Sequence, residues 1–185
     1  MRRVLALVTF AVLTACGWQP EDDARVSPAP SSTARAAVCA ASETPIFACS
    51  FADGKRVAVC GTEGGVAEYR FGGEDAIDFV LDGGQNATAM YSGGGESQLA
   101  FSSGATRYIV FSRIVRTGFD ESGNDPAISD GVVVERGGEF LAIRVCDDPE
   151  VKPVDVDAAE AFLPVRVRAK LFTDETIRAD TDSNE

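Results

Sequence analysis

The 185-residue chain contains no histidine. Histidine is the side chain whose ordinary pKa lies nearest neutrality, and it is the commonest general base and metal ligand. Its absence excludes Ser-His-Asp and Cys-His catalytic arrangements and histidine-ligated zinc sites. The sequence also lacks a C-x-x-C pair and a glycine-rich phosphate loop. Because only carboxylate chemistry would remain, we predict a protein without catalytic activity, cofactor or metal site.

Basic side chains are scarce. The chain has 17 lysines and arginines against 29 aspartates and glutamates, which gives a formal net charge of −12. Such a surface repels nucleic-acid phosphates and anionic head groups and attracts positive charge. We therefore predict no nucleic-acid partner, and a basic protein if the partner is a protein.

The first residues have the pattern of an export signal. Arg2 and Arg3 precede the apolar run Val4–Val12, which is too short to span a bilayer as a helix and is typical of a signal peptide. The following Leu13-Thr14-Ala15-Cys16 resembles the lipobox of bacterial lipoproteins, in which the cysteine is lipidated before cleavage. That resemblance implies a signal peptide over residues 1–15 and a mature chain anchored through Cys16. An ordinary signal peptide followed by an unmodified cysteine is the alternative.

The resemblance to lipoproteins also predicts a location. In that group an aspartate after the cysteine favours the inner membrane, and the chain has Gly17 instead. We therefore expect a cell-envelope protein that its lipid anchor holds on the outer membrane. The protein would face the periplasm. Loss of Arg2 and Arg3 leaves 15 basic against 29 acidic side chains, a net charge of −14.

Composition divides the rest of the chain. Residues 16–38 are rich in proline, serine, alanine and charge, which predicts a disordered tether. A β domain is expected over residues 39–149, an extension over 150–172, and a disordered acidic tail over 173–185. In the extension, Asp157 and Glu160 resemble a capping box that opens a short helix, and Pro164 should end it.

Short apolar and β-branched runs separated by glycine-rich turns predict a mainly β fold, a small antiparallel β-barrel or sandwich. In the last hairpin, a Gly137-Gly138 loop would place Val134 opposite Leu141 and Val132 opposite Ile143. The expected strands are Ile46–Phe51, Arg56–Cys60, Val66–Phe71, Ile77–Leu81, Ala87–Tyr91, Ser97–Ser102, Thr106–Arg116, Gly131–Arg136 and Glu139–Cys146.

The four cysteines of the β domain predict two disulfides in an exported protein; they are Cys39, Cys49, Cys60 and Cys146. A loop at Ala52–Gly54 puts Cys49 on the apolar face of the first hairpin and Cys60 on the other, so these two should not pair. We favour Cys49–Cys146 with Cys39–Cys60. The register of the last hairpin places Cys146 with Phe140, which counts against this pairing unless a bulge intervenes.

Two further resemblances rest on short motifs. The pattern Phe47-x-Cys49, Gly54-Lys55, Val57-x-Val-Cys60 and Tyr69-x-Phe71-Gly72 resembles small uncharacterised exported bacterial domains, with which no activity is associated. The segments Tyr91–Gly95, Phe101 and Ser102–Gly104 resemble those of membrane-bound lysozyme inhibitors. That family's inhibitory serine and lysine would fall at Ala87 and Ser103.

Polar residues in the long strand are candidates for recognition. Arg107, Tyr108, Arg113 and Arg116 suggest the polar outer face of an amphipathic strand, and together with Tyr91 they form a possible binding surface. The acidic segment Asp120–Asp125 could offer oxygen ligands to calcium. It lacks the spacing of an EF-hand loop, which favours a solvated turn.

We therefore predict a lipid-anchored cell-envelope binding or structural module without catalytic activity. The alternative is an inhibitor of a hydrolase such as lysozyme.

Overall fold

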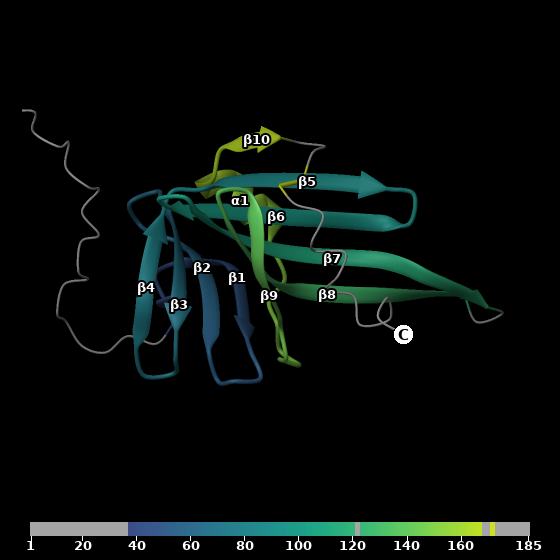
Figure 1. Cartoon of the computed structure of the whole chain (residues 1–185), viewed down its shortest axis with the longest axis horizontal. Coiled ribbons are helices and arrows are strands. Elements are labelled where there is room, and N and C mark those ends of the chain that lie inside the picture. Colours follow the sequence, from purple (N-terminus) through teal and green to yellow (C-terminus); the bar gives the residue numbers. More distant parts are fainter. Residues whose placement is uncertain (1–36, 121–122, 168–170, 173–185) are drawn as a thin grey trace, which may run out of the picture.

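The computed structural model describes residues 37–120, 123–167 and 171–172. The expectations for the signal peptide, Cys16, most of the tether and the acidic tail lie outside these residues. In the residues described, the fold consists of two β-sheets and one short helix (Figure 1). The four-stranded sheet has the order β1 (Thr44–Ser50), β2 (Arg56–Gly61), β3 (Ala67–Gly72) and β4 (Ile77–Asp82).

The second sheet has six strands in the order β10-β5-β6-β7-β8-β9. All neighbours are antiparallel except β10, which pairs parallel with β5. Helix α1 (Val156–Phe162) lies between β9 and β10 in the chain. The strands span Gln85–Tyr91 (β5), Gly94–Ser103 (β6), Thr106–Asp120 (β7), Gly123–Arg136 (β8), Glu139–Val145 (β9) and Val165–Val167 (β10).

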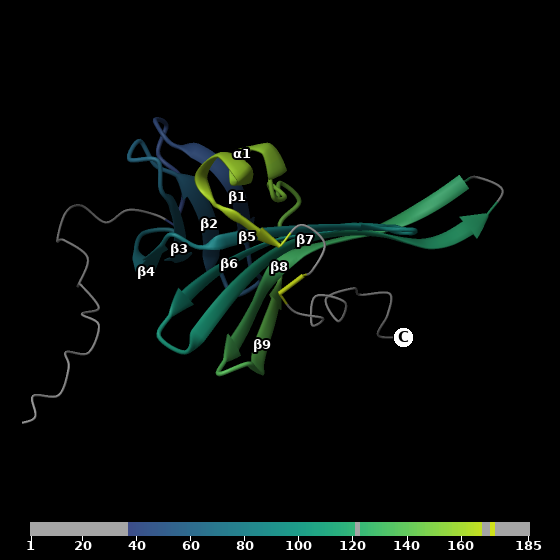
Figure 2. The same ribbon diagram turned by 90° about the horizontal axis from the view of Figure 1, so that it is seen from above.

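The prediction of a mainly β fold is confirmed, and its arrangement is sandwich-like rather than a barrel. The strands of the two sheets cross at a steep angle, and neither sheet closes on itself in the described part of the chain (Figures 1 and 2). One core fills the space between them, with Val59 and Tyr69 from the first sheet, Leu99 and Val110 from the second, and Leu163 beside α1. This crossing resembles orthogonal sheet packing.

The register of the first hairpin follows the prediction. Phe47 pairs with Val59 and Cys49 with Val57, and Gly54 has a φ of +80° in the turn. Side chains alternate along a strand, so Cys60 points away from this apolar face. The predicted disulfides Cys39–Cys60 and Cys49–Cys146 are both present. The second one joins the first strand to the end of the second sheet.

The pairing predicted for the last hairpin is wrong by one residue. The two-residue loop is present, but a β-bulge lies between it and the sheet, so Val134 pairs with Ala142 and Val132 with Arg144. The extra residue in β9 reverses which side chains face each side of the sheet. Cys146 therefore lies on the core side with Val132, where it reaches Cys49.

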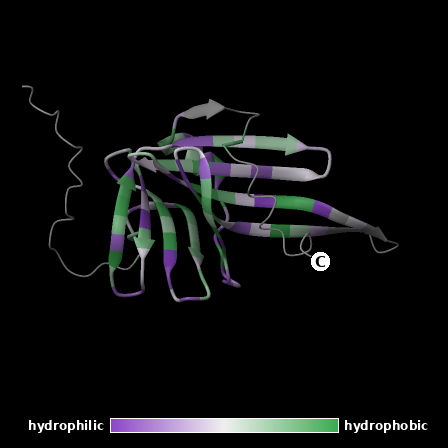
Figure 3. Ribbon diagram, viewed as in Figure 1, coloured by the Kyte–Doolittle hydropathy of each residue, from purple (hydrophilic) through white to green (hydrophobic). Residues whose placement is uncertain are grey.

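Strands β7 and β8 are longer than predicted. We expected residues 117–130 to form a loop containing the acidic segment, but β7 extends to Asp120 and β8 begins at Gly123. The paired ends of these strands project from the rest of the molecule as an arm (Figures 1 and 2). Apolar residues continue along both strands beyond the crossing of the sheets (Figure 3). The side chains of residues 119–125 lie outside the described set, so the calcium alternative to a solvated turn is not tested.

The helix of the extension begins earlier than predicted. Its N-cap is Asp155, whose side chain accepts a hydrogen bond from the Ala158 amide at 3.1 Å, and not Asp157. The helix ends before Pro164, as expected for a residue that cannot continue it. Its Phe162 ring packs over Gly61, where an added Cβ would lie 2.5 Å from the ring. The extension is thus packed against β1 and β2 as part of the same domain.

A buried arginine holds the first described residues on the outer face of the four-stranded sheet. Arg70 is 1% exposed and forms ion pairs of 2.6 Å with both Glu43 and Glu68. It also donates to the carbonyl oxygen of Val38 at 3.1 Å. The Cys39–Cys60 disulfide fastens the same segment to β2, so a disulfide and a buried ion-pair cluster together hold it on this face of the sheet.

Candidate functional site

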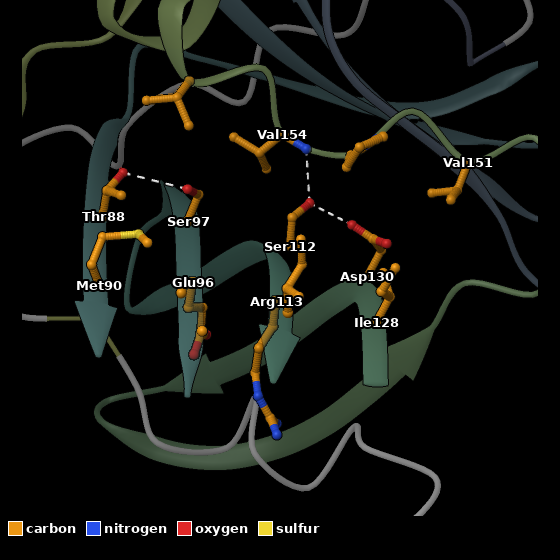
Figure 4. Close-up of a pocket in the computed structure, with 15 residues that line it drawn as sticks. Thr88, Met90, Glu96, Ser97, Ser112, Arg113, Ile128, Asp130, Val151 and Val154 are labelled. Atoms are coloured by element: carbon orange, nitrogen blue, oxygen red, sulfur yellow. Dashed lines mark hydrogen bonds between the residues drawn. The ribbon is translucent and has the colours of Figure 1, made fainter. Parts of the chain in front are cut away.

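A groove of about 640 Å³ lies on one face of the six-stranded sheet (Figure 4). Strands β5 to β8 form its floor. The segment between β9 and α1, together with the first residue of the helix, forms its roof with Val151, Pro153, Val154 and Val156. The floor consists of two rows of side chains that run across the strands. We call them the inner row and the outer row.

The inner row is polar and continues directly from the buried core. Successive register pairs join its members, which are Thr88, Ser97, Ser112 and Asp130. Ser112 donates to Asp130 at 2.5 Å and accepts a hydrogen bond from the Val154 amide at 2.7 Å. The roof is therefore hydrogen-bonded to the floor at Ser112 (Figure 4).

The outer row is apolar and open to solvent. Its members are Met90, Gly95, Ile114 and Ile128, again joined by successive register pairs. Met90 is 81% exposed, Ile114 51% and Ile128 64%. Gly95 leaves room for the Met90 side chain, because an added Cβ would lie 2.6 Å from its sulfur. Three large apolar side chains on adjacent parts of one sheet face therefore lie in water.

The roof is held in place from both ends. Lys152 exchanges backbone hydrogen bonds of 2.9 and 3.1 Å with Ala48 of β1, and the Asp155 amide donates to the Ile46 carbonyl at 2.9 Å. On the other side, the Asp147 amide donates to the Ser50 carbonyl at 2.9 Å. Because β1 belongs to the other sheet, the groove is formed by the packing of the whole domain.

Besides Glu96, whose carboxylate accepts a hydrogen bond from Gln98, the groove is lined by one further carboxyl group, Asp130. It is 5% exposed, and burial raises its pKa, opposed by the hydrogen bond from Ser112. That bond engages the oxygen Oδ1. Within the described residues, no hydrogen bond or ion pair reaches the second oxygen, Oδ2. The groove thus combines an apolar outer floor with one buried carboxyl whose second oxygen is available.

The structure separates the polar residues that we grouped on one strand face. Arg107 pairs with Glu135 at 3.0 Å and lies over the Phe172 ring at 5.2 Å. Tyr108 is on the other face, where its ring is 5.6 Å from that of Tyr69 in the core. Arg113 is only 5% exposed.

The interpretation of these residues as one polar outer face is therefore wrong. Arg107 and Arg113 share their face of β7 with the buried Ile109 and Phe111, since side chains alternate along a strand. The remaining candidates, Tyr91 and Arg116, are exposed near the β5–β6 turn, where the Arg116 amide donates to the Gly93 carbonyl.

The segments that resemble lysozyme inhibitors are not brought together. The Tyr91–Gly95 turn precedes β6 and the Ser102–Gly104 turn follows it, so they lie at opposite ends of that strand. Ala87, the counterpart of the inhibitory serine, is fully buried.

The groove residues were missed from the sequence. Met90, Ile114 and Ile128 lie on three different strands, and their neighbourhood follows only from the strand registers. The sequence held one weak signal for these longer strands. Apolar residues stand on both sides of the turn-like acidic segment, at 114–115 before it and at 127–128 after it.

Among the described residues, one group of possible metal ligands is close enough to share an ion: Cys39, Glu43 and Cys60. The two sulfurs are joined in a disulfide, so they are not available to a metal. No helix in the described ranges is both long and apolar enough to cross a membrane. Comparison with protein-family models, with curated proteins and with solved structures found no match.

Proposed function

We propose that this protein is a lipid-anchored module of the cell envelope that binds a partner protein in its groove and catalyses no reaction. The observation that carries the proposal is the exposed apolar outer row beside the roof. A monomer exposes single apolar side chains freely, whereas contiguous apolar exposure in a concave site marks an interaction surface. Burial of Met90, Ile114 and Ile128 by a partner would contribute about 25 cal/mol for each Å² covered.

The chemistry of the rest of the chain supports binding rather than catalysis. The sequence has no histidine. Two carboxylates, Asp130 and Glu96, line the groove beside hydroxyl groups and apolar side chains, and that of Glu96 accepts a hydrogen bond from Gln98 at 2.8 Å. Its volume of about 640 Å³ suits a few side chains of a partner. The partner that we propose is a basic protein, because the chain carries a formal net charge of −12.

The location rests on the lipobox-like Leu13–Cys16 and on the disulfides. Two bridges suit an oxidising compartment outside the cytoplasm. We place the mature protein on the outer membrane, facing the periplasm, with Cys16 as the lipidated residue. In cells labelled with radioactive palmitate, Cys16→Ser should abolish labelling of this protein. Unchanged labelling would contradict the lipid anchor and leave the groove proposal standing.

The groove itself is tested by site-specific photo-crosslinking in cells. A benzophenone amino acid in place of Met90 should give a discrete protein adduct, and the same amino acid in place of Val80 should not. Val80 is 39% exposed on β4, away from the groove. Ile128→Asn should reduce the adduct formed at Met90, whereas Val80→Asn should leave it unchanged. Equal adducts from both positions, or none at Met90, would contradict the proposal.

A further inference from the structure

We infer that the partner segment in the groove presents one lysine flanked by apolar residues, and that the lysine ammonium pairs with Asp130. The inference rests on the proposed function and names the chemistry of the occupant. The apolar flanks cover the outer row, and the lysine reaches beneath the roof to the inner row. Asp130 is then the residue of this chain that determines specificity for the basic side chain.

The available oxygen of Asp130 favours lysine over arginine. Ser112 already donates to Oδ1 at 2.5 Å, which leaves Oδ2 as the carboxylate oxygen of Asp130 that accepts no hydrogen bond from the described residues. Arginine presents a planar fork that is best matched by two free acceptors. Lysine carries a compact charge with rotatable donors, which suits one oxygen.

The spacing of the two rows fits the length of a lysine side chain. Asp130 and Ile128 lie on the same face of β8, two residues apart, which corresponds to about 7 Å along a strand. A partner backbone above the outer row can therefore send a lysine stem of four carbons along the apolar floor to Asp130. The stem contacts Ile114 and Ile128 while the ammonium leaves water only at the carboxylate.

Among the described residues, neither of the two basic side chains at the groove competes for Asp130. Arg113 is directed away from the groove (Figure 4), and Lys152 of the roof is 3.5 Å from the carboxylate of Asp155. A carboxylate as buried as that of Asp130 is costly without an opposite charge nearby. A bound ammonium supplies that charge and adds a charge-assisted hydrogen bond.

The test uses a methyl signal inside the groove. The sequence has two methionines, Met1 and Met90, so methyl-¹³C labelling of methionine places one reporter in the outer row. The chain carrying Cys16→Ser is titrated with the capped peptide Leu-Val-Lys-Val-Leu and followed by NMR. Parallel titrations use peptides in which norleucine or arginine replaces the lysine. Each is repeated with Asp130→Asn and, as a control for the lost charge, with Asp82→Asn on the exposed edge of β4.

We expect the lysine peptide to shift the Met90 methyl signal and to bind at least about tenfold more tightly than the other two peptides. Asp130→Asn should remove that preference, and Asp82→Asn should preserve it. Equal binding of the norleucine and lysine peptides would overturn the lysine inference while leaving an apolar docking groove intact. A lysine preference that survives Asp130→Asn, or no shift of the Met90 signal by any peptide, would also overturn it.

Discussion

The two disulfides should contribute unequally to stability, because they close loops of very different length. Cys49–Cys146 spans 97 residues of sequence and Cys39–Cys60 spans 21. In the chain-entropy model a cross-link restricts the unfolded chain by an amount that grows with the logarithm of the loop length. The model gives a stabilisation of about 4.7 kcal/mol for the longer loop and about 3.3 kcal/mol for the shorter one.

The two bridges are well matched in other respects. Each joins one fully buried cysteine, Cys49 or Cys60, to one that is half-buried, Cys146 or Cys39. Replacing both cysteines of a bridge by alanine therefore removes a similar packed volume in the two cases. The difference in unfolding free energy between the two double variants should then report mainly on the loop length, and we expect about 1.4 kcal/mol.

The measurement is urea unfolding followed by far-UV circular dichroism, with the free energy of unfolding extrapolated to water. Each double variant keeps the other bridge, so neither contains a free cysteine in the β domain. We expect the variant without Cys49–Cys146 to be the less stable of the two. An equal or larger loss on removing Cys39–Cys60 would refute the loop-length reasoning and would point instead to the buried contacts around Arg70.

Three further predictions concern single residues. Arg70→Ala should lower the unfolding free energy by about 3–5 kcal/mol, because it removes a buried cation and leaves two half-buried carboxylates without it. A loss below about 1 kcal/mol in urea unfolding would contradict this. Gly131→Ala should lower the unfolding free energy by about 1–3 kcal/mol, since the new Cβ would lie 2.2 Å from a carbonyl oxygen of β9. As a control, Gly73→Ala adds a Cβ that meets no atom within 4 Å, and it should change the unfolding free energy by less than about 0.5 kcal/mol. Asp130→Asn should stabilise the fold at neutral pH, because burial raises the pKa of Asp130 in the folded protein above its value in the unfolded chain. As pH rises from the unfolded pKa to the folded pKa, ionisation of Asp130 lowers the unfolding free energy of the parent protein. Asparagine does not ionise, so the variant avoids this loss. The gain should shrink as pH falls towards the ordinary pKa of an aspartate, and a gain independent of pH between acidic and neutral buffers would show that it has another cause.

Local patterns were sufficient for the parts of the fold that depend on neighbours in sequence. The first hairpin has a short loop with Gly54 in a left-handed conformation, and the alternation of Phe47 and Cys49 with polar residues left one register with an apolar face. That register separated Cys49 from Cys60. With four cysteines, this exclusion left two pairings, and the favoured one is present.

The last hairpin shows where such reasoning fails. Its loop is the two-residue turn that Gly137 and Gly138 predict, yet Val134 pairs with Ala142 rather than Leu141. A bulge adds one residue to a strand, and no local pattern in β9 requires it. It is present where Cys146 must reach the core side of the sheet to bond with Cys49. This is a requirement set by residues almost a hundred positions away.

By itself the sequence determined a mainly β domain with two disulfides, a short helix before Pro164 and an acidic charge, because each of these follows from composition or short-range alternation. Only the tertiary structure decided the bulge, the long β7–β8 arm and the groove. The outer row of the groove takes Met90, Ile114 and Ile128 from three strands, and its roof is fixed by hydrogen bonds to β1 in the other sheet. Such a site depends on the relative register and packing of distant segments, which are set by the free energy of the whole fold rather than by any one stretch of chain.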